Sequence, residues 1–415
     1  MKLDRNIIFA GRTCEKAEIM RRIENAQHEA SVTGIGIYDV DMDEKVGQSF
    51  VELLKNDAGR QWKNINITRC GGMSVAKVVA TIMALPNVRK FSLEGVTIEQ
   101  EELEKHLHSL LEHGCEASLE DFTLRRCRIS APIASALCRY HNLISLDLSG
   151  CTIDSDEVVY ELARGIQENS KLETLSLLEC RMVDSQVQTI LEAFHHHLSL
   201  RDVNIGNNKC EVKGMAALAN LLKSNDIPIS TLALSSCKPD ISMLTSALAE
   251  NTTIRRLDLT FNGLDDCDIT LLSESLCINS TLQQLDLEGN KITDAGLCGF
   301  CLQLPEMKGL KKILLADNSV GEEGALALAH ALRFNMTLEE CDIGGRLRCP
   351  LDVLEDLDYY LDLNWGGRRI LADEDFSLAL WPNVIERAAS QAGALGRNHL
   401  DIINYMIQGP ALLQR

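Results

Sequence analysis

The residues of this chain with the most chemical potential stand in short motifs of glycine, aspartate, cysteine and histidine. Gly34 and Gly36, in the segment GIGIYD, have the spacing of the first two glycines of a dinucleotide-binding loop. Asp39 stands where the third glycine should be, and no strand–helix–strand pattern follows. The segment therefore predicts no site for nucleotide phosphates.

The aspartates at positions 39, 41 and 43 imitate the first ligands of a calcium loop. Such a loop needs glycine at its sharp turn and a bidentate glutamate at its end. This chain has Glu44 at the first of these places and Phe50 at the second. We therefore expect no calcium site here.

Cysteine and histidine give no better metal or redox site. Cys298 and Cys301 form C-x-x-C within a helical segment, without a second pair or a thioredoxin-like unit, so we expect them to pack in a core. Three adjacent histidines on a helix cannot face one metal, and spaced ones do so only in part. The adjacent histidines are His195 to His197. The spaced ones are His106, His108 and His113, and of these only His106 and His113 share a face of the helix. We predict no catalytic residue, metal or cofactor, and hence no enzyme.

Asn279-Ser280-Thr281 is an acceptor pattern for N-glycosylation in a chain with 15 cysteines, which raises the question of secretion. The N-terminal apolar run, residues 7–10, is shorter than the roughly 7–15 residues of a signal peptide. The missing signal and the odd number of cysteines favour free thiols in a reducing compartment. We expect an intracellular, cytoplasmic protein, with the nucleus as an alternative.

The composition narrows the class of partner. The 415 residues are 45% hydrophobic, which argues against disorder, and the net charge is −19. An acidic surface repels phosphate backbones and anionic lipid, so we expect no nucleic acid and no membrane insertion. No window approaches the roughly 18 apolar residues of a membrane span.

One phrase, L-x-x-L-x-L-x-x-N/C-x-L, recurs along the chain. Eleven copies, most of them 28 or 29 residues apart, start at Trp62, Val88, Leu119, Leu143, Leu172, Leu200, Ile229, Ile254, Leu282, Leu310 and Leu338. A degraded twelfth copy starts at Val32. The clearest copies read LISLDLSGCTI, LETLSLLECRM, IRRLDLTFNGL, LQQLDLEGNKI and LKKILLADNSV.

This phrase and period are the signature of leucine-rich repeats, and the spacing with a helical half resembles the ribonuclease-inhibitor-like subclass. The resemblance covers residues 32–350. It implies an α/β solenoid, or horseshoe, with a concave parallel β-sheet and convex helices. Helices are about 10 Å across and strands stack at about 4.8 Å, so stacked repeats must curve with the sheet inside.

Three recurring residues have structural explanations. The ninth phrase position holds a small hydrogen-bonding side chain, in Cys70, Cys127, Cys151, Cys180, Cys237, Asn208, Asn262, Asn290 and Asn318. Another asparagine recurs three residues before a repeat start, at Asn169, Asn251, Asn279 and Asn335, where the helix ends. Asn279 is therefore interpreted as structural rather than glycosylated. Glycine recurs at an offset of fourteen, where the chain turns into the helix, in Gly214, Gly296 and Gly324.

We predict three regions: an N-terminal helical cap at 1–31, leucine-rich repeats at 32–350 and a C-terminal helical cap at 351–415. After the last repeat the chain reads LDLNWGGRRIL, then LWPNVIERAAS. This tail resembles the C-terminal segment of uncharacterised repeat proteins of unicellular algae, which have LN-x-x-GR-x-L followed by LWP and a helix. We expect Trp365 and Trp381 to plug the end of the core.

If the fold is right, phrase positions three, five and seven point out of the concave sheet, with nine acidic and four basic residues among them in the clearer repeats. Asp258 and Asp286 fall in adjacent repeats and reinforce one negative field. The partner-binding candidates are Asp121, Arg125, Asp147, Asp202, Arg256, Asp258, Asp286, Glu288, Lys312 and Asp342. A polar strand face is also what any exposed sheet shows, and that interpretation stays open.

We predict a scaffold or adaptor that recognises a protein partner, and no small-molecule substrate, through this face or an edge. A rival is regulation of a small GTPase, because Ran GTPase-activating proteins resemble this repeat type and its acidity. That resemblance implies an arginine loop early in the array, to which only Gly59-Arg60 and Arg125-Arg126 come near. Ribonuclease inhibition and a recognition module like that of intracellular immune receptors are further alternatives.

Overall fold

The computed structural model describes residues 5–11, 16–26, 32–55, 62–83, 85, 87–96, 119–137, 140–153, 155–195, 197–344 and 349–368. The chain forms two compact units. Unit 1 is Met1–Ala217 with Asp226–Ile229, and unit 2 is Leu218–Asn225 with Ser230–Arg415. Each is treated separately below.

Unit 1 contains eight described strands that pair in chain order, every pair parallel. They are β1 (Arg5–Ala10), β2 (Val32–Tyr38), β3 (Asn64–Thr68), β4 (Lys90–Glu94), β5 (Asp121–Arg125), β6 (Ser145–Asp147), β7 (Thr174–Ser176) and β8 (Asp202–Asn204). The helices between them are α1 (Lys16–Ala26), α2 (Glu44–Lys55), α3 (Val75–Met83), α5 (Ala131–Leu137), α6 (Asp156–Glu168) and α7 (Asp184–Glu192). Helix α8 (Val212–Ser224) has residues in both units.

Unit 2 repeats the same order with five described strands, again parallel. They are β9 (Thr231–Ala233), β10 (Arg256–Asp258), β11 (Gln284–Asp286), β12 (Lys312–Leu314) and β13 (Glu340–Asp342). The helices are α9 (Ile241–Glu250), α10 (Asp266–Ile278), α11 (Asp294–Gln303), the short 3₁₀ turn η1 (Leu304–Glu306), α12 (Glu322–Leu332) and α13 (Leu351–Trp365).

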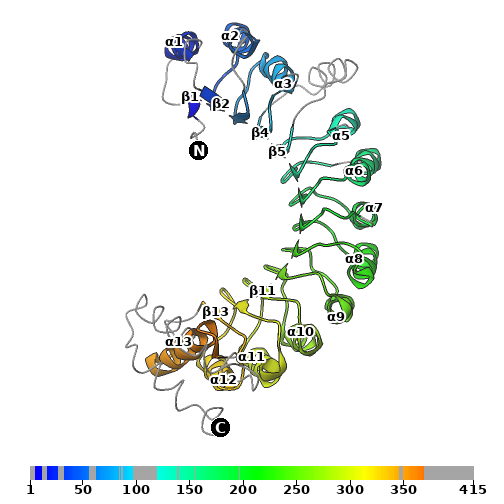
Figure 1. Ribbon diagram of the computed structural model, residues 1–415, viewed down its shortest axis with the longest axis vertical. Helices are drawn as coiled ribbons and strands as arrows, with labels where there is room; N and C mark the ends of the chain where they lie inside the picture. The colour runs from blue at the N-terminus through cyan, green and yellow to red at the C-terminus, as the bar shows by residue number, and fades with distance from the viewer. Residues whose placement is uncertain are drawn as a thin grey trace, which may run out of the picture. The chain divides into compact units, whose positions relative to one another are not determined.

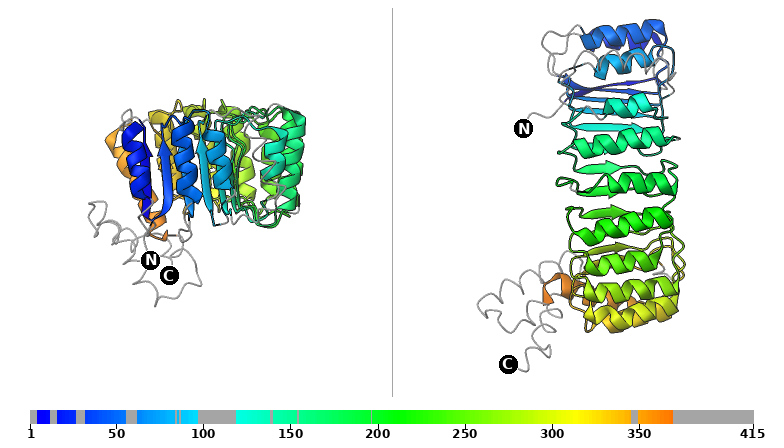
Figure 2. Two further views of the ribbon diagram at one scale, coloured as in Figure 1. Left: turned by 90° about the horizontal axis from the view of Figure 1, so that it is seen from above. Right: turned by 90° about the vertical axis from the view of Figure 1, so that its right-hand side faces the viewer.

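In each unit the helices that the structure describes lie along one face of the sheet (Figures 1 and 2). The predicted α/β leucine-rich-repeat fold is thereby confirmed. Alternation along each strand sends leucines such as Leu257 and Leu285, each at most 1% exposed, toward the helices. The core lies between the sheet and the helix layer. We call the other side the open face.

The repeat phrase locates the strands to the residue. In all eleven copies the strand begins two residues after the predicted start, from Trp62 and β3 to Leu338 and β13. Strand β2 covers the degraded copy that starts at Val32.

The N-terminal segment differs from the helical cap that the sequence predicts over 1–31. Its described part contains helix α1 but also strand β1, which pairs with β2 from Ile7↔Ile35 to Ala10↔Tyr38. Residues 7–10, the apolar run that is too short for a signal peptide, lie in this strand. Phe9 is fully buried, with its ring 5.2 Å from that of Phe50 on α2.

The ninth-position side chains link neighbouring turns, as predicted. Asn290 donates from Nδ2 to the carbonyls of Leu259 (3.1 Å) and Leu287 (2.8 Å), and its Oδ1 accepts the N–H of Asn262 and Leu264 (3.0 Å each). Seven of the nine predicted residues are buried, while Cys127 and Asn318 are half-buried. Burial raises the pKa of the Cys180 thiol to about 12, so the residue stays a neutral donor.

The asparagines at the helix ends form a second ladder. Asn279 is 4% exposed, and its Nδ2 donates to the carbonyls of Leu248 (2.6 Å) and Asn251 (2.9 Å), while its Oδ1 accepts the N–H of Leu282 (2.8 Å). A buried and fully engaged amide leaves no room for a glycan. The backbone at Asn279 is extended, with φ −74° and ψ 121°. Hydrogen bonding, rather than tolerance of a left-handed conformation, selects asparagine here.

The glycines at offset fourteen have a different origin from the turn that the sequence indicates. Each lies in the first turn of a helix, against an aspartate of the preceding repeat. A Cβ on Gly296 would stand 2.2 Å from Asp266 Oδ1, and one on Gly324 would stand 2.7 Å from Asp294 Oδ1. The Asp294 carboxylate accepts the N–H groups of Gly321 (2.7 Å) and Gly324 (3.0 Å), which fixes one helix start to the next.

The described part of the predicted C-terminal cap, 351–415, comprises α13 and the residues up to Arg368. Asn364 continues the asparagine ladder by donating to the carbonyls of Asn335 (3.0 Å) and Leu338 (2.8 Å). Arg368 is 9% exposed and donates from Nη2 to the carbonyls of Leu332 (2.9 Å) and Asn335 (2.8 Å) at the end of α12. A cation at a helix C-terminus is favourable. Trp381 lies outside the described residues.

Candidate functional site

The open face of each unit carries the side chains that alternation turns away from the core. Phrase positions three and five lie on the strand itself. Position seven ends the strand in β3 to β5 and lies two residues beyond the strand in β6 to β13. In most strands these outer residues are half-buried and the residue between them is buried. The predicted partner-binding residues divide between the two faces, with Asp121, Arg125, Asp147 and Asp202 in unit 1 and the other six in unit 2.

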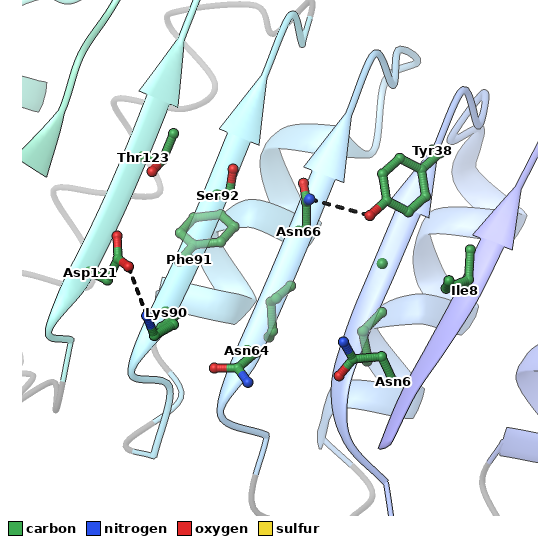
Figure 3. A pocket seen from close by; sticks show the side chains of 13 residues that line it. Asn6, Ile8, Tyr38, Asn64, Asn66, Lys90, Phe91, Ser92, Asp121 and Thr123 are labelled. Atoms are coloured by element: carbon green, nitrogen blue, oxygen red, sulfur yellow. Dashed lines mark hydrogen bonds and ion pairs between the residues drawn. The ribbon is translucent and has the colours of Figure 1, made fainter. Parts of the chain in front are cut away.

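The face of unit 1 is hollowed across strands β1 to β5, with a volume of about 270 Å³ (Figure 3). Tyr38 and Asn66 point toward one another there, and Asn66 Nδ2 donates to the Tyr38 hydroxyl at 3.3 Å. Beside them Lys90 Nζ pairs with Asp121 Oδ2 at 3.1 Å. This places the predicted residue Asp121 in the lining of the hollow, together with residues such as Asn64 and Asn66 that the sequence analysis did not single out.

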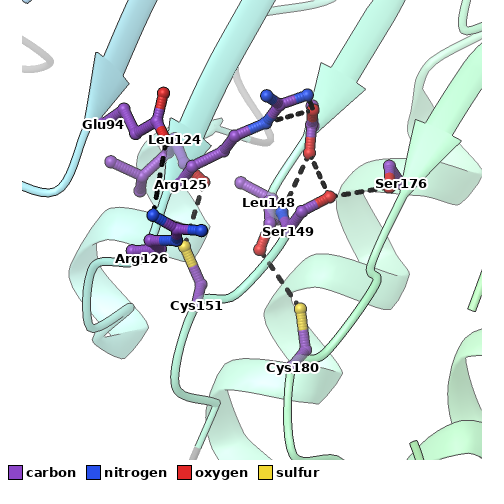
Figure 4. A network of polar contacts seen from close by, with 10 residues as sticks. Glu94, Leu124, Arg125, Arg126, Leu148, Ser149, Cys151, Ser176 and Cys180 are labelled. Atoms are coloured by element: carbon purple, nitrogen blue, oxygen red, sulfur yellow. Dashed lines mark hydrogen bonds and ion pairs between the residues drawn. The ribbon is translucent and has the colours of Figure 1, made fainter. Parts of the chain in front are cut away.

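The next strands of unit 1 carry a preformed ion pair (Figure 4). Arg125 Nε donates to Asp147 Oδ2 at 2.8 Å, and this contact raises the pKa of the arginine. The other carboxylate oxygen of Asp147 accepts the N–H of Ser149 at 2.9 Å, and the Ser149 hydroxyl is 2.8 Å from that of Ser176. Adjacent strands therefore share one hydrogen-bonded network on the open face. Asp202 lies half-buried on β8, two strands from Asp147.

The face of unit 2 brings Asp258 and Asp286 together, since they are register partners on β10 and β11. Burial raises the pKa of Asp286, and the charges of Asp258 and Glu288 raise it further. Among the described residues no ion pair engages Asp258, Asp286, Glu288 or Asp342. The sequence prediction that these acids share one field therefore agrees with the geometry of the two central ones.

The two predicted basic residues of unit 2 lie at the opposite ends of their strands from these acids. Arg256 Nε donates to Thr231 Oγ1 at 3.0 Å, and Lys312 Nζ pairs with Glu340 at 2.6 Å. Each begins its strand, whereas Asp258 and Asp286 end theirs. The open face of unit 2 thus has a basic rim and an acidic rim.

The aspartate that recurs at phrase position five has a structural role that the sequence analysis missed. Asp258, Asp286 and Asp342 each accept, on Oδ1, the N–H of the residue two positions on, at 2.9, 3.1 and 2.8 Å. Asp147 does the same in unit 1, and Asn204 fills the place with a neutral amide. This is an Asx turn that ends the strand. The asparagine at 204 is the signal that could have revealed it.

The rejected motifs have ordinary structural roles. Gly34 and Gly36 lie within β2, and Asp39 forms an ion pair with Arg69 at 2.8 Å. Asp43 Oδ1 accepts the N–H of Val46 at the start of α2. Within the described ranges, no three His, Cys, Asp or Glu side chains come close enough to hold a metal. Cys298 and Cys301 lie in α11, and the second is buried.

The arginine candidates for GTPase regulation are only partly visible. Arg125 is tied to Asp147, and Arg126 Nη1 lies 3.8 Å from Glu94 Oε1. Gly59 and Arg60 lie outside the described residues, as do His106, His108 and His113. No helix in the part of the chain that the structure describes has both the length and the apolar character to cross a membrane.

Comparison with known proteins agrees with this architecture. A family model described as "Leucine Rich repeat" matches residues 250–270 and 279–301. NACHT, LRR and PYD domains-containing protein 12 of Mus musculus is 27% identical over 53% of this chain and 22% of its own length. Ribonuclease inhibitor of Sus scrofa is 27% identical over 65% of this chain and 60% of its own length.

Among solved structures, an internalin of Listeria monocytogenes covers 82% of this chain and 86% of its own, with 13% identity and a TM-score of 0.46. The chain spans about a fifth of the NACHT, LRR and PYD domains-containing relative and less than two thirds of the inhibitor.

Proposed function

Because the chain is a leucine-rich-repeat protein of the ribonuclease-inhibitor-like type, we propose that it is a non-catalytic module that binds another protein on the open sheet face. The contact extends over strand residues of consecutive repeats, so that it recognises a surface rather than a small molecule. Asp121, Arg125, Asp147 and Asp202 would contribute in unit 1, and Arg256, Asp258, Asp286, Glu288, Lys312 and Asp342 in unit 2.

The observation that supports this proposal most directly is the register pair Asp258 and Asp286. Two carboxylates on neighbouring strands, about 5 Å apart by strand spacing, repel one another. The charge of Asp258 adds to the burial that raises the pKa of Asp286, and no described ion pair neutralises either residue. A lysine or arginine of a partner placed between them would relieve this repulsion. The acidic rim is therefore the proposed contact for a basic surface.

The character of the open face also indicates the kind of affinity. Tight interfaces usually centre on buried aromatic anchors, whereas the outer positions of β9 to β13 are mainly polar and charged. Charged complementary faces raise association rates and select partners more than they raise affinity. We propose a moderate, electrostatically guided contact.

We propose an intracellular setting for this contact. All twelve cysteines in the described residues are free thiols, and Cys70, Cys151, Cys180 and Cys237 serve as hydrogen-bonding or packing residues in the repeats. Free thiols persist in a reducing compartment.

The test replaces Asp258 and Asp286 with asparagine together. Asparagine keeps the Oδ1 acceptor of the strand-ending turn and removes the charge, so the fold is preserved while the acidic field is lost. Capture of the main partner from an extract of the native cell, quantified by mass spectrometry, should fall about tenfold for the loss of two charge contacts.

The control variant carries Glu274→Gln and Glu323→Gln, two exposed residues of the same unit that lie on helices α10 and α12. It makes the same change in net charge and should capture the partner normally. Equal capture by both double variants and the unaltered chain would remove the open face of unit 2 as the contact surface.

A further inference from the structure

A second surface of unit 2 is hollowed to about 440 Å³ at the N-terminal ends of β10 to β13. Phrase positions two and three of four consecutive repeats line it, so each repeat contributes two adjacent side chains. In order across the sheet these are Arg255 and Arg256, Gln283 and Gln284, Lys311 and Lys312, and Glu339 and Glu340, followed by Trp365 of α13. We call this surface the basic-rim groove.

The charges within the groove are arranged so that its β10 end remains positive. Lys311 pairs with Glu339 at 2.8 Å and Lys312 with Glu340 at 2.6 Å, so the two acidic residues are matched by the two lysines. Arg255 is exposed, and its guanidinium has no ion-pair or hydrogen-bond partner among the described residues. The lining therefore carries four basic and two acidic side chains in a protein whose net charge is −19.

The middle and the far end of the groove supply other kinds of contact. The side-chain amides of Gln283 and Gln284 make no hydrogen bond within the described part of the chain, so they are free to pair with a backbone. Trp365 is half-buried and presents part of its indole to the groove, rather than only plugging the core as the sequence predicts. A cationic end, an amide-lined stretch, two lysine–glutamate pairs and an aromatic wall follow one another in that order.

We propose that the basic-rim groove binds an extended acidic segment of a partner protein. A carboxylate of the segment contacts Arg255 and Arg256, its backbone lies over the two glutamines, and an apolar side chain packs against Trp365. Charge-assisted hydrogen bonds from arginine to carboxylate are among the stronger polar contacts in water.

Strand spacing sets the length of the segment. From β10 to β13 there are three steps of about 4.8 Å, or roughly 14 Å, which about four residues of extended chain would span. The matching motif is therefore one or two acidic residues followed about four residues later by an apolar one. This inference rests on the proposed function, and it adds a second charge sign to the same unit, so that a partner with basic and acidic patches would dock in one orientation.

The probe is a fluorescein-labelled peptide with two adjacent glutamates and a leucine four residues further on, with serine and glycine elsewhere. Binding to the full chain is followed by fluorescence anisotropy. Saturable binding is expected for this peptide. A matched peptide with lysines in place of the glutamates should bind at least about tenfold more weakly, because it meets the same arginines with the opposite sign.

The variant is Arg255→Gln with Arg256→Gln, which keeps hydrogen-bonding side chains and removes both charges. It should weaken binding of the glutamate peptide about tenfold or more. The matched control is Lys223→Gln with Lys291→Gln, which removes two basic charges of unit 2 outside the groove and should leave binding within about twofold. Unfolding midpoints of both variants establish that they are folded.

Three results would overturn the inference: no saturable binding of the glutamate peptide, equal binding of the lysine peptide, or equal affinity of the arginine variant. Tighter binding of a single-stranded oligonucleotide than of the peptide, lost in the arginine variant, would also overturn it and assign the groove to phosphates. Partner capture that depends on Asp258 and Asp286 but not on Arg255 and Arg256 would leave the proposed function standing while this inference fails. Capture that depends on the two arginines but not on Asp258 and Asp286 would support the groove and overturn the acidic rim as the contact surface.

Discussion

At the scale of single residues, this chain satisfies one structural requirement with different side chains. The position three residues before a repeat start holds Asn279 in one repeat and His197 in another. Asn279 accepts the N–H of Leu282 at 2.8 Å, and the Nδ1 of His197 accepts that of Leu200 at 3.2 Å. The histidine run that could suggest a metal site thus contains one buried structural residue.

His197 predicts a pH dependence of stability. Burial lowers its pKa below the ordinary value of 6.5, while the carbonyls of Asn169 and Ile166 oppose this shift to a lesser degree. Between the unfolded and the folded pKa the unfolded chain binds more protons, so the free energy of unfolding decreases as pH falls below about 6.5. Replacing His197 with asparagine keeps an acceptor and removes the titrating group.

We therefore expect the loss in urea midpoint between neutral and mildly acidic pH to be smaller in His197→Asn than in the unaltered chain. The remaining histidines are common to both proteins and cancel in the comparison. Parallel pH profiles of the two midpoints would show that His197 is not the titrating group.

For single residues of the candidate site, the sequence predicted which face of the sheet they lie on but not their hydrogen bonds. Alternation along the strand puts Asp258 and Asp286 on the open face, and the structure has them there in register. Their turn hydrogen bonds depend on the backbone geometry after the strand, and Asn204 at the equivalent position is the sequence signal that points to them. The same carboxylates therefore end a strand and create a field, and only charge-removing substitutions separate these two roles.

At the scale of elements, the sequence predicts most where one requirement repeats. The inward leucines recur with a fixed period, so every one of the eleven predicted repeats has its strand at the expected residues. Strand β1 was not predicted, because Arg5–Ala10 lacks the rest of the repeat phrase. Its apolar residues resemble a short hydrophobic run until their pairing with β2 is known.

The fit between neighbouring repeats predicts different outcomes for two glycines of helix α11. Alanine at Gly296 would place Cβ 2.2 Å from Asp266 Oδ1, and this carboxylate is held by the N–H of Thr293 at 2.8 Å. We expect Gly296→Ala to lower the free energy of unfolding by about 1–3 kcal/mol, the usual cost of overpacking.

Gly299 lies on the same helix and supplies the control. A Cβ there would meet only Thr270 Oγ1 at 3.5 Å, an ordinary contact, so alanine should stabilise the helix by up to about 1 kcal/mol. Unfolding by urea, followed by circular dichroism, measures both. Equal effects of the two substitutions would mean that the approach of Asp266 does not require glycine.

At the scale of the whole molecule, net charge determines which partners are attracted at long range. A net charge of −19 repels phosphate backbones and attracts basic proteins at long range. The sequence predicts this general attraction but not where a partner stops, because the two rims of unit 2 depend on which end of a strand each charge occupies. Arg256 and Asp258 are only two residues apart, yet they belong to opposite rims.

This separation of charges predicts how salt affects binding of the captured partner. Raising NaCl from about 0.1 M to about 1 M shortens the screening length from about 10 Å to about 3 Å, which removes long-range attraction while contacts in the interface persist. The association rate constant, measured by surface plasmon resonance with the purified partner, should therefore fall steeply with salt, and the dissociation rate constant should change much less. The variant with Asp258→Asn and Asp286→Asn should associate more slowly at low salt and approach the unaltered chain at high salt, because screening and substitution remove the same field. An association rate constant that rises with salt would instead indicate an apolar contact. The open face of unit 2 would then not be the surface that binds the partner.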